Sequence, residues 1–329
     1  MEKYGLAIVA ITENGLEISR KISESFPADI FASQRFQPEN KVKIFVSLKE
    51  TIKELFTGYE TIIFIMALGA VVRLISPYIK NKFEDPCIIV IDDGGKFVIP
   101  VIGGHHGSNE LSKGIAGILN ASAVITTASD VNGVPSLEML AKKYSMSIKN
   151  TQNLPAVSMD LIDGLPVQVT NNTNIVIPEL NNSGSGKRIT VSYEIEDNKY
   201  GIILIPKVLD VGIGFSTDAT YTDMKNAIES VFRKYGLYLE AIRSISTITI
   251  KEGNTDLKVL AGDLNCMLNY YPPEKLNENS VTRSAAVYRA TGAYSVSNAS
   301  ARISSSGGKE LVSKEIINNT TISVFLHGH

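Results

Sequence analysis

Residues 96–119 read KFVIPVIGGHHGSNELSKGIAGIL and pass from an apolar strand through a glycine-rich turn into a helical pattern. The turn, from Gly103 to Glu110, contains an adjacent histidine pair, His105 and His106. Such a turn exposes backbone N–H groups at a helix N-terminus, where negative charge is favoured, and its glycines let a ligand approach the backbone. Histidine adds a group that exchanges protons near neutral pH. We therefore expect a functional site at this turn.

Strand and helix patterns alternate on both sides of this stretch. This alternation predicts an α/β sheet with helices on its faces, which we assign to an N-terminal domain of residues 1–148. Residues 92–95, Asp-Asp-Gly-Gly, favour a hairpin between two of its strands. The expected strands are 4–11, 42–47, 61–68, 86–91, 96–102 and 121–126.

The pattern changes near Asn150. From there to Pro206 the helical spacing is lost and short β-like runs appear, so residues 149–207 are expected to form a small β-rich middle segment. A second α/β region, residues 208–329, contains an Ala- and Ser-rich stretch, 285–303, that is consistent with one tightly packed helix. The predicted fold class is α/β, with two α/β sandwich-like domains joined by the middle segment.

Composition excludes several classes of protein. The 329 residues are 44% hydrophobic and 20% charged, with a net charge of −2, which argues against a nucleic-acid partner. The longest apolar stretch, residues 61–72, is too short to span a bilayer, so no membrane partner is expected. Cys87 and Cys266 lie far apart in the sequence, each among apolar residues. We therefore expect both to be reduced and buried thiols. We expect a soluble, cytoplasmic protein.

Two further turns follow apolar strands, one from Gly69 to Arg73 and one from Thr126 to Gly133. Ligands of open α/β sheets bind at the carboxyl ends of strands, so three such turns at one edge would form a site. Turns and helix caps use Gly, Ser, Asn and Asp for purely structural reasons. Capping does not require a histidine pair, which favours a functional role for the Gly103–Glu110 turn.

Other site chemistries are poorly supported. Adjacent histidines usually point apart, and no His-Glu-x-x-His or Cys-x-x-Cys pattern supplies further ligands, so no dedicated metal site is expected. Neither a phosphate-binding loop nor a Gly-x-Ser-x-Gly nucleophile motif occurs. His327 and His329 close the chain and are expected to be exposed tail residues.

Four motifs in order resemble the N-terminal domain of the CbiG-type cobalt-precorrin-5A hydrolases of anaerobic cobalamin biosynthesis. They are ALGAVVRLISP at 67–77, Lys82 with Asp85-Pro86, GGHHGSNEL at 103–111, and VITTASDVNG at 124–133. The C-terminal part is similar to the family's C-terminal domain, but more distantly. The family's usual Cys-Arg-Arg-Gly is here Phe215-Ser216-Thr217-Asp218, and a common glutamate is Asn298. These departures argue against a grip on substrate carboxylates by this domain.

The resemblance implies a two-part reaction. Water opens a δ-lactone on a cobalt-containing tetrapyrrole, and a two-carbon fragment then leaves as acetaldehyde to give cobalt-precorrin-5B. This chemistry needs an activated water, a donor for the developing oxyanion, and acid–base groups. We expect His105 or His106 to be the general base, and Glu110 to orient it or act as the second acid–base group. Asp130 is a second candidate base.

The expected substrate contacts surround these groups. The Gly104 and Gly107 N–H groups, with Asn109, would stabilise the oxyanion, while Arg73 and Lys82 would pair with acetate and propionate arms. No cofactor is expected, because the cobalt belongs to the substrate. The full set of expected substrate-binding residues is Gly69, Arg73, Lys82, Gly103, Gly104, Gly107, Ser108, Asn109, Thr126 and Thr127.

Three alternatives remain open at this point. A histidine that ligates the substrate's cobalt would make the chain a tetrapyrrole carrier or a catalytically weak paralogue. A scaffold protein would instead hand a labile intermediate to other cobalamin-pathway enzymes through transient contacts. The third alternative is a generic anion-binding α/β protein of unrelated purpose.

Overall fold

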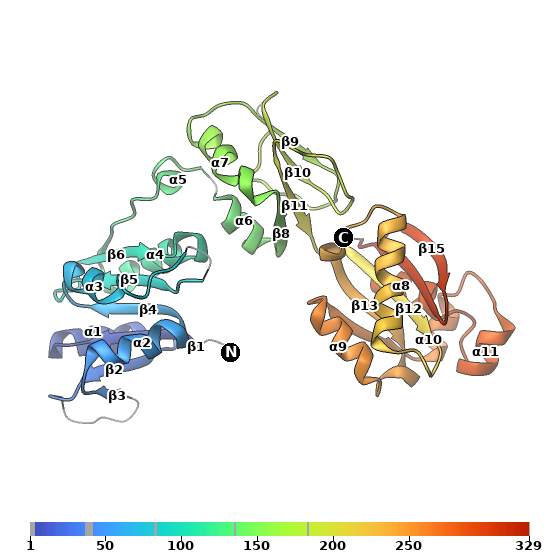
Figure 1. The fold of residues 1–329 in the computed structure, drawn as a ribbon, viewed down its shortest axis with the longest axis horizontal. Coiled ribbons are helices and arrows are strands. Elements are labelled where there is room, and N and C mark those ends of the chain that lie inside the picture. The colour runs from blue at the N-terminus through green and yellow to red at the C-terminus, as the bar shows by residue number, and fades with distance from the viewer. Residues whose placement is uncertain (1–3, 37–41, 82–83, 135, 183, 329) are drawn as a thin grey trace. The chain divides into compact units, whose positions relative to one another are not determined.

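The computed structural model describes residues 4–36, 42–81, 84–134, 136–182 and 184–328 (Figure 1). The chain divides into two compact units, Met1–Met139 and Leu140–His329. Both are built from sheets and helices, so the predicted α/β class is confirmed. The division into three parts at residues 148 and 207 stays a prediction, and the expected middle segment lies within the second unit.

The first unit is built on a seven-stranded sheet of order β3-β2-β1-β4-β5-β6-β7. Two core clusters lie on its opposite faces: α2 and α3 pack into one, and α1 and α4 into the other. The central strand β4 is apolar on both sides, because Ile62, Ile63 and Phe64 are all fully buried. The strands are β1 (Tyr4–Ala10), β2 (Asp29–Ser33), β3 (Val42–Phe45), β4 (Tyr59–Ile65), β5 (Cys87–Ile91), β6 (Phe97–Ile102) and β7 (Ser122–Ala123); the helices are α1 (Glu13–Ser23), α2 (Leu48–Gly58), α3 (Leu68–Ile75), α4 (Ser108–Leu119) and α5 (Ala128–Val131), followed by α6 (Leu137–Lys143) at the boundary between the units.

Strand direction reverses within this sheet. Strands β1 to β5 are parallel, but β6 pairs with β5 in the antiparallel sense, and β7 is parallel to β6. The expected hairpin of β5 and β6 is therefore confirmed. As a result, the carboxyl end of β6 lies at the edge of the sheet where β5 begins, opposite to the carboxyl end of β4, and β7 points toward the same edge.

The second unit begins with a four-stranded sheet of order β8-β11-β10-β9. The expectation that residues 150–206 lack helices is wrong, because helix α7 (Leu154–Ile162) lies among these strands. The helix buries only two residues, Leu154 and Val157, so its hydrophobic periodicity in the sequence is weak. The strands are β8 (Met146–Lys149), β9 (Val167–Asn171), β10 (Lys187–Val191) and β11 (Ile202–Pro206).

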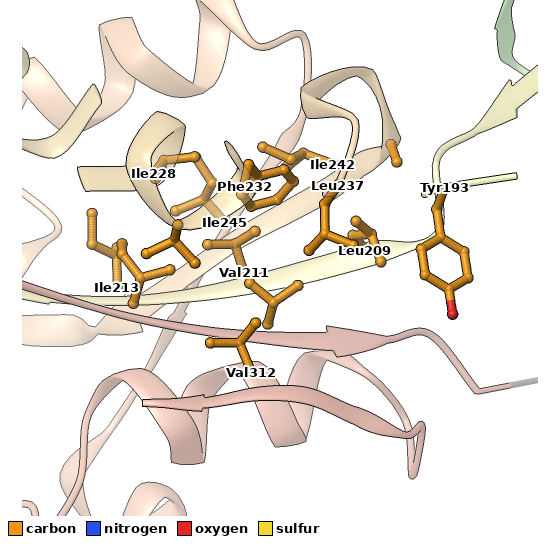
Figure 2. Close-up of a cluster of buried hydrophobic side chains, with 14 of the residues drawn as sticks. Tyr193, Leu209, Val211, Ile213, Ile228, Phe232, Leu237, Ile242, Ile245 and Val312 are labelled. Carbon is orange, nitrogen blue, oxygen red and sulfur yellow. The ribbon is translucent and has the colours of Figure 1, made fainter. Parts of the chain in front are cut away.

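A five-stranded sheet of order β14-β13-β12-β16-β15 follows in the same unit. Strands β12, β13 and β14 are parallel, whereas β16 runs antiparallel to β12. Helix α8 packs on the main core, where Ile228 and Phe232 contact the strand residues Val211 and Ile245 (Figure 2). The elements are β12 (Leu209–Phe215), α8 (Tyr221–Lys234), β13 (Ile242–Ile248), α9 (Thr255–Asp263), β14 (Met267–Tyr271), α10 (Pro273–Glu278), α11 (Ala285–Thr291), α12 (Ser297–Ser304), β15 (Glu310–Ile317) and β16 (Thr320–Leu326).

The single helix expected over residues 285–303 is instead two helices, α11 and α12. Gly292 follows α11 with a φ of 74°, in the left-handed region, and ends that helix. The Ala- and Ser-rich composition is still explained by packing. Helix α12 buries Ala299, Ser300 and Ala301 against the sheet, where only small side chains fit.

The two cysteines differ in burial. Cys87 is buried as expected, whereas Cys266 is only partly buried, and both are free thiols. Within the described ranges no helix is both long enough and apolar enough to cross a membrane.

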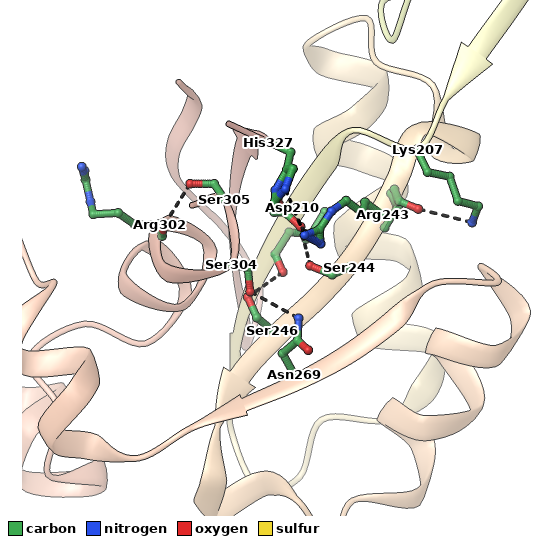
Figure 3. A network of polar contacts seen from close by, with 12 residues as sticks. Lys207, Asp210, Arg243, Ser244, Ser246, Asn269, Arg302, Ser304, Ser305 and His327 are labelled. Atoms are coloured by element: carbon green, nitrogen blue, oxygen red, sulfur yellow. Dashed lines mark hydrogen bonds and ion pairs between the residues drawn. The ribbon is translucent and has the colours of Figure 1, made fainter. Parts of the chain in front are cut away.

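The chain end is held by a buried polar network (Figure 3). Asp210 of β12 is fully buried and accepts hydrogen bonds from Ser244 at 2.5 Å and from His327 Nδ1 at 2.8 Å. Arg243 Nη2 lies 3.2 Å from His327 Nε2, and because arginine only donates, Nε2 must accept. Burial raises the pKa of Asp210, while Ser244, Arg243 and His327 oppose that rise. The expected exposure of His327 is therefore wrong: its side chain is 23% exposed.

We expect His327→Ala to lower the free energy of unfolding of the second unit by about 2 kcal/mol, because it removes a donor from a buried carboxylate. Urea unfolding at neutral pH measures the change. Lys309→Ala, an exposed lysine on the same terminal segment, is the matched control. Equal stabilities of the two variants would contradict a structural role for the Asp210–His327 contact.

Candidate functional site

The glycine-rich turn packs directly against the sheet. Gly103 follows β6 with a φ of 92°, residues Gly104–His106 form a short 3-10 turn, and Gly107 has a φ of 100°. A side chain at position 103 would place its Cβ only 2.7 Å from the Cα of Cys87, the first residue of β5. Glycine is therefore required at position 103 both for its backbone conformation and for the close approach to β5.

Helix α4 begins at the end of this turn without a side-chain cap. Ser108 and Asn109, its first two residues, are buried, and Glu110 is exposed. The buried hydroxyl of Ser108 makes no hydrogen bond in the described part of the chain. An uncapped helix N-terminus beside an unsatisfied buried hydroxyl is suited to hold a negatively charged or oxygen-rich group.

Asn109 joins this turn to the one that follows β7. Its Nδ2 donates to Thr127 Oγ1 at 2.9 Å and to Asp130 Oδ2 at 2.8 Å. Lys113, one turn further along α4, donates to Asp130 Oδ1 at 2.8 Å. Gly104 lies beside Asn109, since a Cβ at position 104 would be 3.5 Å from Asn109 Nδ2. The structure thus brings together the turns at 103–110 and 126–133.

Asp130 is held as a carboxylate in this cluster. Burial raises its pKa, but the hydrogen bonds from Lys113 and Asn109 outweigh that effect and keep the pKa below its usual value. A carboxylate stabilised in this way is a poorer proton acceptor. This environment favours a structural role for Asp130 over that of a general base.

Some of the groups expected to contact the substrate already form hydrogen bonds within the protein. The two hydrogen bonds from Asn109 occupy the donors of its amide, and the Gly107 N–H donates to the Gly104 carbonyl at 3.3 Å. His106 lies in the 3-10 turn with a half-buried side chain. Thr126 and Thr127 are exposed. Lys82 and the side chain of His105 lie outside what the structure describes.

The three turns do not meet at one edge of the sheet, so the condition for a single site formed by all three is not fulfilled. The expected turn from Gly69 to Arg73 is the first part of helix α3. This helix follows β4, whose last residue, Ile65, pairs with Ile91 at the far end of β5 from Cys87. The 103–110 turn lies beside Cys87 because β6 runs in the opposite direction. Arg73 is exposed and its Nη1 donates to the Gly69 carbonyl at 3.3 Å.

The Asp130 cluster makes stability depend on pH. A lowered pKa in the folded state stabilises the fold above the unfolded value near 4, and this contribution is lost as pH falls through the folded pKa. We expect Asp130→Asn to destabilise the first unit by about 1 kcal/mol at pH 7, with the difference from wild type shrinking below about pH 4. Urea unfolding at both pH values measures this, with Glu24→Gln, an exposed carboxyl of the same unit, as control. A difference that grows on acidification would contradict the assignment.

The second unit contains a cavity that the sequence analysis missed. It has a volume of about 360 Å³ and lies at the carboxyl ends of β12 and β13, where Gly214, Thr247 and Lys251 contribute to its lining. The motif Gly212-x-Gly214 was the available sequence signal, but it lacks the third glycine of a dinucleotide fingerprint. Among the described residues no cluster of three or more His, Cys, Asp or Glu could hold a metal ion.

Comparison with known proteins agrees with the motifs. Residues 50–130 match the family model described as "Cobalamin synthesis G N-terminal", and residues 209–325 match "Cobalamin synthesis G C-terminus". The cobalt-precorrin-5A hydrolase of Priestia megaterium is 29% identical over 97% of this chain and 94% of its own length. That of Salmonella typhimurium is 26% identical over 92% of both chains. A crystal structure of a cobalamin biosynthesis protein G homologue from Sulfolobus solfataricus is 25% identical, with a TM-score of 0.41 and coverage of 98% and 97%.

Proposed function

The chain belongs to the cobalamin synthesis G family, and from this premise we propose that it is a cobalt-precorrin-5A hydrolase of anaerobic cobalamin biosynthesis. Both domains of the family are present in the family's order. The hydrolases that it resembles align with nearly the whole chain, so the similarity is not confined to one domain.

The proposed reaction has a hydrolytic step and a carbon–carbon cleavage. Water adds to the lactone carbonyl, and the ring C–O bond breaks to leave a carboxylate and an alcohol. Loss of the alcohol proton then forms the C=O bond of acetaldehyde. The electron pair of the broken carbon–carbon bond passes to the macrocycle, which is protonated in turn. The cobalt stays in the tetrapyrrole throughout, as part of the substrate.

The location that we propose for the active site rests on the N-terminus of α4. Negative charge develops on the lactone oxygen as water adds, and an uncapped helix N-terminus stabilises such charge. Gly107 leaves space at this helix end, since a Cβ there would meet only Met139 Cε, at 3.9 Å. The Asn109–Asp130 bond holds the neighbouring turn at the same edge of the sheet.

The proton transfers are assigned to the histidine pair. His105 or His106 takes a proton from the attacking water, since a neutral imidazole is a competent base near pH 7. Glu110 follows in the first turn of α4 and orients the base or serves as the second acid–base group. Asp130 is assigned to holding Asn109 and Lys113. Gly69 and Arg73, whose turn starts at the opposite edge, are left out of the chemical step.

Anaerobic incubation of the full chain with cobalt-precorrin-5A tests the proposed function. Acetaldehyde is trapped as a hydrazone, and the macrocycle is followed by mass spectrometry and its visible spectrum. We expect stoichiometric acetaldehyde together with a macrocycle that has lost the two-carbon fragment. A spectral shift on binding without any acetaldehyde would overturn the hydrolase and select the carrier alternative.

A further inference from the structure

The cavity of the second unit lies where ligands of parallel sheets bind. Strands β12 and β13 are parallel and end side by side at Phe215 and Ile248, both of which line the cavity. The chain builds β13 and β14 on one side of β12 and then returns to its other side, where β16 pairs with it, so the strand order reverses at β12. Such switch points leave a crevice at the carboxyl ends of strands. A cavity of about 360 Å³ falls within the range of small-molecule sites.

The lining combines apolar surface with positive charge. Phe215, Val287 and Val296 present apolar side chains, and Lys251 and Lys314 supply two ammonium groups. No aspartate or glutamate occurs among the described lining residues. The cavity is therefore suited to a ligand with an apolar body and anionic arms.

Several other lysines of this unit are paired with a carboxylate of the protein. Lys234 pairs with Glu315 at 2.6 Å and Lys187 pairs with Asp160 at 2.9 Å. Among the described residues, neither Lys251 nor Lys314 has a carboxylate within ion-pair distance, although the charge of Lys251 contributes to the lowered pKa of Asp218, whose main hydrogen-bond partner is Ser216. Lys251 Nζ instead lies 4.7 Å from the centre of the Phe215 ring, at the cavity wall. A charge held in this way can still pair with an anionic ligand.

Helix α11 forms an accessible wall of the cavity. Ala286, Val287 and Ala290 of this helix line the cavity, yet none of the residues of α11 is fully buried. The short side chains leave open space, and the exposed helix leaves a route from solvent. A planar molecule could insert one edge there while its remainder stays outside.

We propose that this cavity binds one edge of a carboxylated tetrapyrrole, with Lys251 and Lys314 pairing with its acetate or propionate carboxylates. The identity of the ligand rests on the proposed function, whereas the chemistry of the cavity does not. The sequence alone argues against binding of substrate carboxylates by this domain, because the two arginines that the family usually has after Gly214 are missing from this chain. The structure supplies cations from other segments, since Lys251 follows β13 and Lys314 belongs to β15.

Corrinoid binding by the full chain tests the charge pairing. The probe is cobyrinic acid, a stable cobalt corrinoid with free carboxylates, and its fully methyl-esterified form is the uncharged comparison. We expect Lys251→Met and Lys314→Met each to weaken binding of the acid by roughly tenfold, since each removes one charge-assisted contact. Binding of the ester should not change. Lys258→Met, an exposed lysine of α9 outside the cavity, is the matched control.

A second pair of variants tests the location. Ala290→Phe should fill the cavity and weaken binding of both the acid and the ester. Ala285→Phe, on the same helix but outside the lining, should bind both like wild type. Undiminished binding of the acid by the double lysine variant, or equal binding by the two phenylalanine variants, would overturn the inference.

The two proposals can fail separately. If wild type releases no acetaldehyde but the lysine variants lose corrinoid binding, the hydrolase assignment fails and the cavity assignment stands. If acetaldehyde is released while the lysine and phenylalanine variants bind the acid like wild type, the cavity assignment fails and the hydrolase stands.

Discussion

Replacement of both His105 and His106 by alanine is expected to lower acetaldehyde release by at least about 100-fold, the usual contribution of a general base. The turn should survive the change, because its conformation depends on Gly103 and Gly107, which the double variant keeps. Single-turnover trapping of acetaldehyde measures the rate. The single variants identify the base, since only one of them should reproduce most of the loss.

Folding of the double variant distinguishes the loss of a catalytic group from a structural effect. Near-ultraviolet circular dichroism and urea unfolding provide the control for folding. Undiminished turnover by a folded double variant would refute the assignment of the histidine pair.

Gly212→Ala is expected to destabilise the second unit by about 3 kcal/mol or more, at the upper end of the range for overpacked sites. A Cβ at this position would lie 1.8 Å from the carbonyl oxygen of Ser297 and 2.9 Å from the backbone nitrogen of Ala301. Both contacts are with the backbone of α12, so no side-chain rotation can relieve them. Helix α12 would have to move away from β12.

Gly214→Ala in the same strand is the matched control. A Cβ there would meet Val296 at 3.6 Å, an ordinary van der Waals contact. Urea unfolding of both variants, combined with amide hydrogen exchange in α12, separates a shifted helix from general destabilisation. Equal stabilities would show that the close approach of α12 to β12 does not govern the packing of this unit.

Local sequence patterns predicted much of the secondary structure. The apolar runs at β1 and β4 and the hairpin of β5 and β6 are strands in the structure. The polar start of β2 (Asp29–Ser33) hid a five-residue strand, since alternating burial over so few positions gives a weak signal. Helix α11 was merged with α12 because Gly292, which separates them, can be tolerated within a helical pattern.

The candidate site was only partly accessible to the same reasoning. Strand, turn and helix around Gly103 follow from local spacing, and the structure places Asn109 beside Asp130. The position of the Gly69 turn depended on strand direction. Periodicity does not give strand direction, but the predicted hairpin at residues 92–95 implies that β6 runs opposite to β5 and so places the two turns at opposite edges.

The sequence by itself determined the order of strands, turns and helices around the histidine pair and the family to which the chain belongs, because both depend on residues adjacent in the chain. Only the tertiary structure decided that Asn109 meets Asp130, and it alone placed Phe215, Lys251 and Lys314 around one cavity and His327 against Asp210. These contacts join residues far apart in the sequence. Their geometry depends on how strands pair and helices pack, which no local pattern of hydrophobicity or charge specifies.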